Sequence, residues 1–129
     1  MYNRGVSIVG IGIDVVDVAR MREILADTPS IRDRCFTSAE RAYAERARDS
    51  AERFAVRFAA KEAVMKAMGL GLGAFGFHDV EVVRAADGVP SLSITGDAAR
   101  LAAERGITRW HLSLTHTETT AAAYVIAER

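Results

Sequence analysis

The stretch Ser50-Ala-Glu-Arg-Phe-Ala-Val-Arg-Phe-Ala-Ala-Lys-Glu-Ala-Val-Met-Lys-Ala-Met-Gly69 decides the fold, because it is the longest segment with helical periodicity. Asp49-Ser-Ala-Glu52 has the spacing of a capping box and predicts the start of this helix, and Gly69 predicts its end. The apolar residues recur on one side of the helix. This stripe is formed by Phe54, Phe58 and Met65.

Charged residues interrupt this apolar stripe. At 100° per residue, Glu62 falls within about 40° of Phe58, and Lys61 and Lys66 flank the same stripe by less than a right angle. A buried carboxylate costs several kcal/mol unless it is paired or bound to a metal. An ordinary Glu62–Lys66 ion pair at i, i+4 is the structural alternative. The helix alone leaves a metal site and a salt bridge equally open.

An acidic residue upstream favours the metal site. The segment Val6–Val16 predicts a buried, β-branched strand that ends around Asp14. An aspartate at the end of an apolar strand lies where a sheet presents its ligands. Asp14 and Glu62 together would give Mg²⁺ two carboxylates and leave its other positions for water and phosphate oxygens. Arg57, Lys61 and Lys66 would supply positive charge for the phosphates.

The rest of the chain mixes helices and strands without regular alternation. The predicted helices are 17–26, with Asp17 as N-cap, 37–48, which opens with the capping box Thr37-Ser-Ala-Glu40, and 97–105 before Gly106. The predicted strands are 78–85, 91–95, 110–116 and 121–127, the first two joined by a turn at Asp87-Gly88. This order indicates an α+β fold with a small, mostly antiparallel sheet packed with one long helix and shorter helices. Residues 1–129 form one expected domain.

Composition excludes several classes of protein. The formal net charge is zero, which argues against a nucleic-acid binder, and no apolar stretch is long enough to span a membrane. The N-terminus lacks the features of a signal peptide, and Cys35 is the only cysteine, so we expect a cytoplasmic protein with a buried free thiol. Of the 17 basic residues only Lys61 and Lys66 are lysines, which hints that compact ammonium groups are needed there.

Three separated motifs carry a resemblance to a known family. They are Gly10-Ile11-Gly12-Ile13-Asp14, then Arg57-Phe-Ala-Ala-Lys-Glu-Ala-Val-Met-Lys66, and finally His111-Leu-Ser-Leu-Thr-His116 running into Ala121-Ala-Ala-Tyr-Val. Together they resemble the phosphopantetheinyl transferases, in the form of the short, single-domain acyl-carrier-protein synthases. The resemblance extends over essentially the whole chain in order and spacing.

The resemblance implies a reaction and a set of partners. Family members transfer the 4′-phosphopantetheine group of coenzyme A to a serine of the apo-acyl carrier protein, which supports fatty-acid synthesis, and release adenosine 3′,5′-bisphosphate. It implies that Asp14 and Glu62 ligate Mg²⁺ and that Lys66 binds phosphate or assists proton removal. It further implies a homotrimer with active sites between subunits.

The resemblance also implies contacts to the two substrates. Arg57, Lys61 and His116 would line the nucleotide and its phosphates, and Arg20 would meet the acidic helix of the carrier. His116 shares a strand face with two leucines, so a buried core histidine is its alternative interpretation. The segment before the long helix mixes acids among its bases, unlike the basic stretch of relatives. Arg48 and Arg53 are therefore weaker candidates for contacts to CoA.

Two questions stay open at the level of sequence. Glu62, directly or through a metal-bound water, is the first choice as the base for the serine, and Lys66 is the second, since a free lysine loses its proton only near about pH 10. Two other functions compete with catalysis: a CoA- or nucleotide-binding module without turnover, and a domain whose arginines bind a carrier protein while Glu62 merely pairs with Lys66.

Overall fold

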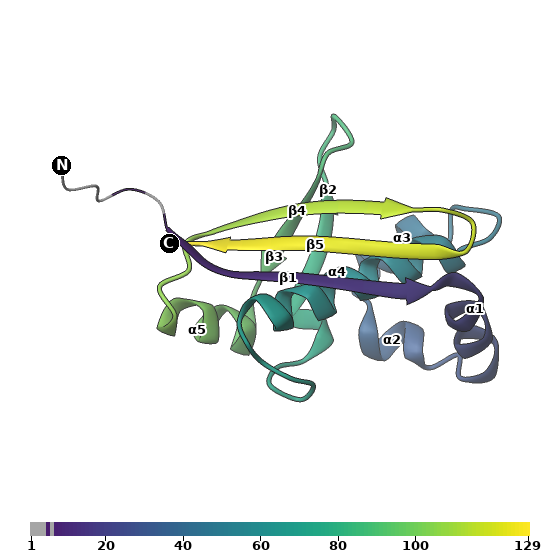
Figure 1. Cartoon of the computed structure of the whole chain (residues 1–129). Helices are drawn as coiled ribbons and strands as arrows, with labels where there is room; N and C mark the ends of the chain where they lie inside the picture. The colour runs from purple at the N-terminus through teal and green to yellow at the C-terminus, as the bar shows by residue number, and fades with distance from the viewer. Residues whose placement is uncertain (1–4, 6) are drawn as a thin grey trace.

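The structure is a computed structural model that describes residues 5 and 7–129. A three-stranded antiparallel sheet has the order β1-β5-β4, and a separate antiparallel hairpin pairs β2 with β3 (Figure 1). The strands are β1 (Ile8–Asp17), β2 (Val80–Arg84), β3 (Pro90–Ile94), β4 (Arg109–His116) and β5 (Thr120–Glu128). The helices are α1 (Val18–Asp27), α2 (Ile31–Cys35), α3 (Ser38–Ala44), α4 (Ala51–Ala67), α5 (Gly96–Glu104) and the 3₁₀ helix η1 (Phe77–Asp79). The predicted α+β class with antiparallel pairing is confirmed.

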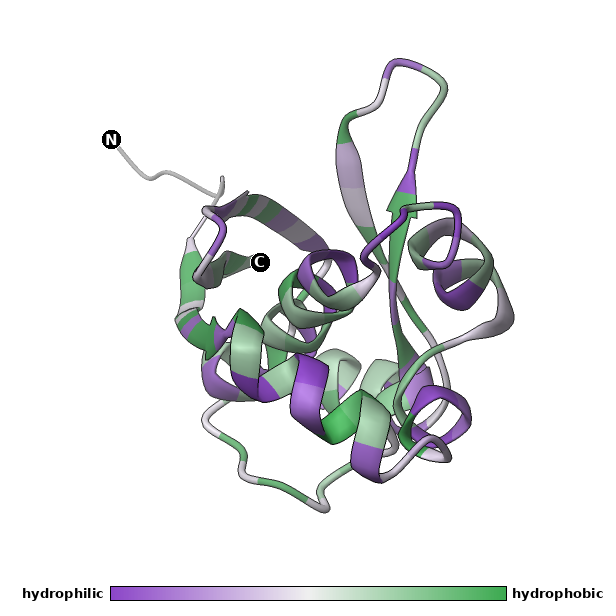
Figure 2. Ribbon diagram, turned by 90° about the vertical axis from the view of Figure 1, so that its right-hand side faces the viewer, coloured by the Kyte–Doolittle hydropathy of each residue, from purple (hydrophilic) through white to green (hydrophobic). Residues whose placement is uncertain are grey.

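The long helix α4 packs along one face of the sheet, with α5 at one end and α1, α2 and α3 at the other (Figure 1). Hydrophobic residues along α4 join two buried clusters. One lies toward the β2–β3 hairpin and α5, and the other lies under α1, α2 and α3. The hairpin projects beyond the rest of the molecule, as Figure 2 shows at its top. The helix thus connects every layer of the fold and can position side chains on several sides.

Two glycines of β1 allow the strand to lie directly on α4. A Cβ on Gly12 would lie 1.9 Å from the carbonyl oxygen of Ala63, and one on Gly10 would lie 1.8 Å from that of Ala67. No side chain larger than hydrogen fits at either position. Because side chains alternate along a strand, Asp14 shares the face of Gly10 and Gly12 and is directed toward α4.

The N-terminal strand differs from its prediction in three respects. Val6 lies outside the described residues. The strand continues to Asp17, so Asp14 lies within the strand and not at its end. The strand is also not buried on both faces, because it is an edge strand whose other face leaves Ile11 and Ile13 about half exposed. The β-branched residues on both faces gave the appearance of a fully buried strand.

The helix boundaries show which of the predicted helix caps form. Asp17 caps α1 by accepting from Ala19 N and Arg20 N, and the capping box of Thr37 and Glu40 opens α3, as predicted. The capping box expected at 49–52 is wrong, since the N-cap Ser50 makes no side-chain bond. The Asp49 carboxylate instead accepts from Ala51 N and pairs with Arg22 at 2.6 Å.

Other predicted elements shift by a few residues. Helix α4 ends at Ala67, and Gly69, with φ of 70°, closes it through a bond from its N–H to Lys66 O. Helix α3 ends at Ala44 and not near Arg48, and the short α2 was not predicted. Cys35 is buried as expected, and burial raises the pKa of its thiol. No helix in the described part of the chain is long and apolar enough to cross a membrane.

Candidate functional site

Asp14 on β1 and Lys66 on α4 form a direct ion pair. The Lys66 Nζ atom donates to Asp14 Oδ1 at 3.0 Å and to the carbonyl oxygen of Ile13 at 3.1 Å. The aspartate is mostly buried, with 16% of its side chain exposed, while the lysine side chain is 54% exposed. The pair therefore lies at the edge of the sheet, where the ammonium group can be reached from solvent.

Glu62 lies beside this pair on the same helix. Burial, and then the negative charge of Asp14, raise the pKa of the Glu62 carboxyl group, while the charge of Lys66 opposes the rise. Among the described residues, the side chain of Glu62 forms no hydrogen bond or ion pair. The i, i+4 salt bridge with Lys66 that the sequence left open is thus not formed, because Lys66 binds Asp14 instead.

Two carboxylates at the edge of a cavity fit the requirements of magnesium. The charge of Asp14 acts on Glu62, and the free Glu62 oxygens have no protein partner in the described residues. A cation between the two carboxylates would remove this repulsion. Among residues 5 and 7–129 no three His, Cys, Asp or Glu gather as a complete cage. Mg²⁺ commonly uses one or two carboxylates and fills its other positions with water and substrate phosphates, and this donor set matches that habit.

Apolar cavities adjoin the two carboxylates. A cavity of about 330 Å³ is lined by Asp14, Glu62, Arg20 and apolar side chains of β1, α1 and α4. A second cavity of about 480 Å³ shares Phe58 and Glu62 with the first and continues toward the loop at Leu72. The carboxylates therefore border a largely apolar groove, and the exposed Arg20 stands on the α1 side of it.

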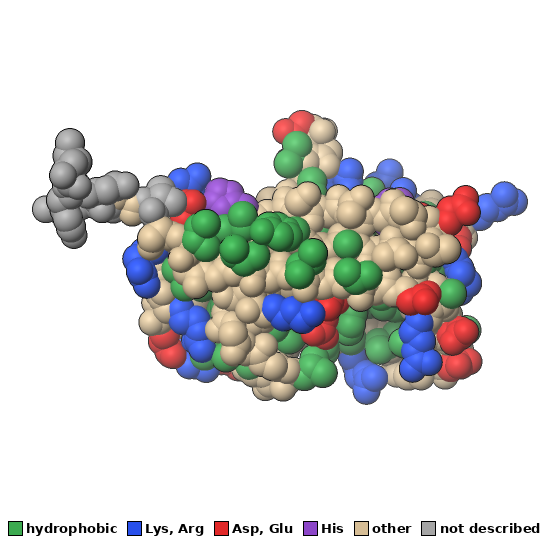
Figure 3. Space-filling model, viewed as in Figure 1, with side chains coloured by type: hydrophobic (Ala, Val, Ile, Leu, Met, Phe, Trp, Pro, Cys, Tyr) green, Lys and Arg blue, Asp and Glu red, His purple; other side chains and the backbone are tan. Residues whose placement is uncertain are grey.

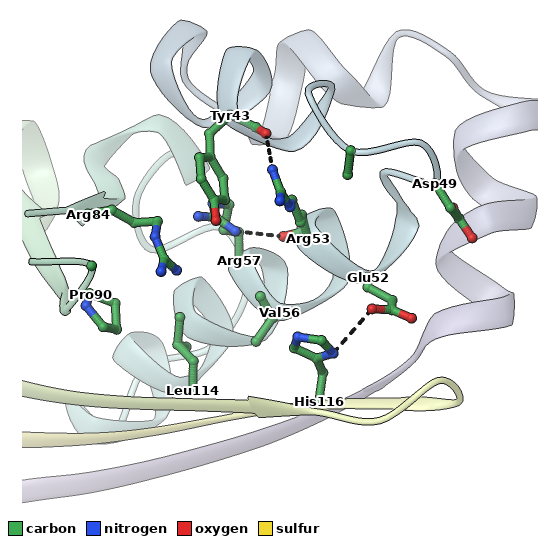
Figure 4. Close-up of a pocket in the computed structure, with 12 residues that line it drawn as sticks. Tyr43, Asp49, Glu52, Arg53, Val56, Arg57, Arg84, Pro90, Leu114 and His116 are labelled. Atoms are coloured by element: carbon green, nitrogen blue, oxygen red, sulfur yellow. Dashed lines mark hydrogen bonds and ion pairs between the residues drawn. The ribbon is translucent and has the colours of Figure 1, made fainter. Parts of the chain in front are cut away.

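A separate basic cavity of about 570 Å³ lies between α3, α4, the hairpin and β4 (Figure 4). Four guanidinium groups lie around the ring of Tyr43. Three of them line the cavity, with Cζ-to-centroid distances of 4.2 Å for Arg53, 4.5 Å for Arg57 and 5.1 Å for Arg84, and the fourth, that of Arg46, lies at 6.0 Å outside the lining. Cationic groups favour the face of an aromatic ring. The ring therefore holds three positive charges together on one wall of the cavity.

The basic side chains are also fixed by hydrogen bonds. Arg53 Nη1 donates to the carbonyl oxygen of Tyr43 at 2.7 Å, and Arg57 Nη1 donates to that of Arg53 at 3.2 Å (Figure 4). Burial lowers the pKa of Arg57, and its buried Nε atom has no hydrogen-bond partner in the structure. A buried guanidinium with a free donor is suited to an anionic ligand.

His116 completes the far side of the basic cavity. Its Nδ1 atom lies 3.2 Å from Glu52 Oε2 (Figure 4). The half-exposed ring lines the cavity beside Leu114, so it is not the core histidine that was the alternative interpretation. Glu52 orients the ring, which leaves Nε2 for a ligand.

The structure corrects one predicted contact and does not test another. Lys61 was predicted to line the nucleotide, but its side chain is 0% exposed and its Nζ atom lies 2.8 Å from Glu40 Oε1. A saturated, buried ammonium group cannot reach a ligand, so this assignment is wrong. Arg48 is exposed and is not one of the residues lining the basic cavity, so its contact to CoA stays a prediction.

Sequence reasoning missed Tyr43, Arg84 and Glu52. Tyr43 follows Glu40 by one helical turn, which was the one available signal that both share a face. Arg84 ends its strand just before a turn, and only the position of the hairpin brings it to Tyr43. Nothing in the spacing of Glu52 and His116 indicates that they meet.

The two groups of functional residues occupy different sides of α4. Arg57 faces β4 and the hairpin, whereas Glu62 faces β1 and α1. At 3.6 residues per turn, Arg57 and Lys66 point in roughly opposite directions from the helix axis. Within one chain, the basic cavity and the carboxylates are therefore separated by the helix and its packing.

Comparisons with known proteins show the family of the chain. The family model described as the 4′-phosphopantetheinyl transferase superfamily matches residues 10–127. A holo-(acyl-carrier-protein) synthase of Salinispora arenicola is 51% identical over 122 residues, which cover 95% of this chain and 99% of the relative.

Solved structures give the same result. The holo-(acyl-carrier-protein) synthase of Neisseria meningitidis aligns with a TM-score of 0.86 at 33% identity, covering 95% of this chain and 100% of that one. That of Bacillus anthracis, in complex with CoA (3′,5′-ADP), aligns with a TM-score of 0.78 at 35% identity, covering 94% and 96%. With nearly full coverage in sequence and fold, the chain belongs to the 4′-phosphopantetheinyl transferase superfamily.

Proposed function

We propose that this protein is a holo-(acyl-carrier-protein) synthase, which transfers 4′-phosphopantetheine from CoA to a serine of apo-acyl carrier protein. The observation that carries the proposal is the meeting of Asp14, Glu62 and Lys66 at one sheet edge. In the reaction, the serine oxygen attacks the phosphorus next to pantetheine. The bond from that phosphorus to the adenosine phosphate breaks, and adenosine 3′,5′-bisphosphate leaves with the electron pair.

We infer that Asp14 and Glu62 hold a magnesium ion. Magnesium bound there would neutralise charge on the pyrophosphate and on the leaving phosphate. Lys66 adds a second positive charge, since its ammonium group is half exposed beside Asp14. The free carboxylate oxygens of Glu62 and the repulsion between the two carboxylates support this assignment.

Glu62 is our first choice for the group that accepts the serine proton. Its oxygens are free of protein donors among the described residues, so it can accept the proton directly or through a metal-bound water. Lys66 donates its protons to Asp14 and Ile13, which suits an ammonium group that binds phosphate. A lysine base would have to give up one of these bonds first.

The basic cavity is proposed to bind the nucleotide end of CoA. Arg53, Arg57 and Arg84 concentrate positive charge around Tyr43, and His116 lies across the cavity. The volume of about 570 Å³ is of the size that small-molecule sites have. Phosphate groups would balance the charge of the three guanidinium groups and satisfy the free Nε atom of Arg57.

We propose a homotrimer in which two chains complete each active site. The nucleotide cavity and the carboxylates lie on different sides of α4, so a second copy is needed to bring them to one CoA molecule. The outer face of the sheet supports assembly, because large apolar side chains gather there (Figure 3). They are Ile8, Ile11, Ile13, Val15 and Tyr124, each between 41% and 61% exposed.

The carrier protein is proposed to approach from the α1 side. Arg20 lines the cavity that Asp14 and Glu62 border, so an acidic helix bound there would bring its serine close to the carboxylates. We further propose that the reaction takes place in the cytoplasm and serves fatty-acid synthesis, as the resemblance implies. Each active site would then join three components: two protein copies and one carrier.

Mass spectrometry of the carrier protein tests the proposed activity. Apo-carrier is incubated with CoA and this protein, with and without magnesium, beside a known transferase as positive control. We expect a mass gain of one phosphopantetheine that depends on magnesium. If CoA binds but the carrier gains no mass while the control transferase works, the chain is a binding module. Carrier binding without CoA binding would indicate an interaction domain.

A further inference from the structure

A buried ion pair joins three elements beside the basic cavity. Lys61 on α4 and Glu40 on α3 are both 0% exposed, with Nζ and Oε1 at 2.8 Å. Lys61 Nζ also donates to the carbonyl oxygens of Phe77, at 3.0 Å, and Val80, so all three of its protons are used. The ammonium group thereby ties α4 to α3 and to the start of β2.

The carboxylate of Glu40 is satisfied in the same way. Its Oε1 atom also accepts from the backbone N–H of Thr37 at 3.0 Å, and its Oε2 atom accepts from that of Val82 at 2.9 Å. The Thr37 hydroxyl group donates to Glu81 Oε2 at 2.5 Å. The bonds to Val82 and Glu81 thus fix the first turn of α3 against β2 at two points. Buried pairs of this kind are a weak source of stability, but they set directions and distances.

The three joined elements carry the residues of the basic cavity. Tyr43 lies one turn after Glu40 on α3, and Arg57 lies one turn before Lys61 on α4. Arg84 lies two residues after Val82 on β2, on the same face of the strand. A cavity of about 220 Å³ touches all three elements at this junction. Tyr43 and Arg57 therefore lie one helical turn from the two residues of the pair, and Arg84 lies one strand repeat from Val82, which the Glu40 carboxylate binds.

The cavity residues need such a frame. Arg57 and Arg84 lie 4.5 Å and 5.1 Å from the Tyr43 ring centroid. Burial disfavours the charge of Arg57 most, the charge of Glu40 favours it, and the charges of Arg84 and Arg53 oppose it. Like charges separate unless their backbones are held. No carboxylate forms an ion pair with Arg53, Arg57 or Arg84 within the described residues. The fixed spacing of α3, α4 and β2 is what keeps both guanidinium groups on the ring.

We propose that Lys61 and Glu40 are positioning residues for CoA: the buried pair sets the register of α3, α4 and β2 that places Arg57 and Arg84 against Tyr43. This inference rests on the proposed function, in which the basic cavity receives the phosphates of CoA. Lys61 contacts no ligand itself. Its contribution is affinity for the nucleotide, separate from the chemistry at Asp14 and Glu62.

The double variant Lys61→Met/Glu40→Gln tests the proposal without leaving a buried charge unpaired. Binding of adenosine 3′,5′-bisphosphate is measured by calorimetry, and transfer gives KM and kcat. We expect Kd and the KM for CoA to rise at least about tenfold while kcat changes by less than about threefold. The matched control is Arg100→Met/Glu104→Gln, which removes an exposed i, i+4 pair on α5 and should change neither constant.

A second pair of variants does not depend on how the double variant folds. Tyr43→Leu removes the ring and should weaken binding of the bisphosphate about as much as the double variant does. Tyr43→Phe keeps the ring and should bind the bisphosphate as tightly as the unchanged protein. Equal affinity of Tyr43→Leu and the unchanged protein would overturn the proposal, and so would a folded double variant with unchanged Kd. A protein that neither binds the bisphosphate nor transfers the arm would overturn the proposed function as well, which separates the two failures.

Discussion

The carboxyl group of Glu62 meets two opposed demands. Its position in the apolar stripe of α4 favours a neutral group, and the neighbouring Asp14 adds to that preference. A magnesium ligand and proton acceptor must instead be ionised. The protein therefore accepts a cost in folding at this residue, and a bound cation would relieve it.

Removing either carboxylate should abolish transfer. Asp14→Ala and Glu62→Gln are each expected to lower kcat/KM at least about 100-fold, because the metal and the proton acceptor depend on them. Initial rates at saturating magnesium measure the effect. Glu104→Gln, an exposed residue of α5, is the matched control and should keep full activity. Near-normal turnover of either site variant would rule out the metal assignment.

Glu62 should also make the stability of the metal-free protein depend on pH. The folded-state pKa lies above the unfolded value, so the contribution of Glu62 to stability is present below the unfolded pKa and is lost as pH rises through the folded one. Without magnesium, Glu62→Gln should therefore melt higher than the unchanged protein at pH 7. The two melting temperatures should converge below about pH 3.5, under the unfolded pKa of about 4.3, where the carboxyl group is mostly protonated in both states.

Adding magnesium in the same melting experiment tests Glu62 as a metal ligand. Excess magnesium should raise the Tm of the unchanged protein at pH 7 and leave that of Glu62→Gln in place, since only a ligand of the folded state stabilises it. A lower Tm for Glu62→Gln in the absence of metal would contradict the assigned cause of the pKa shift.

The sequence could predict some of the individual residues of the site. Asp14, Glu62 and Lys66 were predictable because each is a charged residue within an otherwise apolar pattern. Tyr43 and Arg84 could not be found in this way, since a tyrosine and an arginine in short, partly exposed elements are unremarkable. Their meeting depends on where the hairpin lies, which no local pattern encodes.

At the scale of elements, the contact between β1 and α4 decides where Asp14 stands. The strand approaches so closely that the backbone of α4 occupies the space of a Cβ on Gly10 or Gly12. Asp14 follows Gly12 by one strand repeat, and this contact therefore brings it beside Lys66 of α4. The site is thus a consequence of two glycines as much as of its charged residues.

Gly12→Ala should destabilise the fold severely. Its Cβ would lie 1.9 Å from the Ala63 carbonyl oxygen, and backbone cannot yield as a side chain would. We expect a loss of about 3 kcal/mol or more in the free energy of unfolding, measured with urea. Gly71→Ala is the matched control, since nothing lies within 4 Å of its Cβ, and it should change stability by less than about 0.5 kcal/mol. Equal effects of the two variants would refute the close-contact explanation.

Local sequence signals predicted where helices begin and end better than they predicted which distant residues contact them. The capping box at Thr37 and the Gly69 terminator worked because these bonds form within one turn. The similar pattern at 49–52 does not form a capping box, because the helix begins one residue later, with Ser50 as N-cap, and the Asp49 carboxylate accepts from Ala51 N and pairs with Arg22. The assignment of Lys61 to the ligand was wrong because contacts between distant residues were again missed. A helical wheel shows the direction of the Lys61 side chain but not that α3 and β2 cover it.

At the scale of the whole molecule, the exposed apolar face of the sheet is the main unsatisfied feature. Apolar side chains gather on this face (Figure 3). Ile13 on β1 is 54% exposed and lies between Ile11 and Val15 along the strand. The sequence predicted a buried strand, and the structure leaves this face of β1 exposed in a single chain.

Ile13→Asp should break the assembly. A charge in the centre of an apolar interface costs more than the contact gains, so the particle mass should fall from about three times 14.0 kDa toward that of one chain. Light scattering coupled to size exclusion measures the mass. Ala103→Asp on the exposed side of α5 is the control and should remain trimeric. A fully trimeric Ile13→Asp protein would place the interface elsewhere.

The central claim is that the chain transfers phosphopantetheine at a site completed by two copies. Mixing Arg57→Met, which loses the basic half, with Glu62→Gln, which loses the metal half, tests this directly. Each variant alone should be nearly inactive when CoA is kept well below the KM of Arg57→Met. After the two variants are unfolded and refolded together in equal amounts, random trimers should regain about a quarter of the unchanged protein's transfer rate under these conditions. A mixture as inactive as its components, although mixed trimers form, would contradict the shared site.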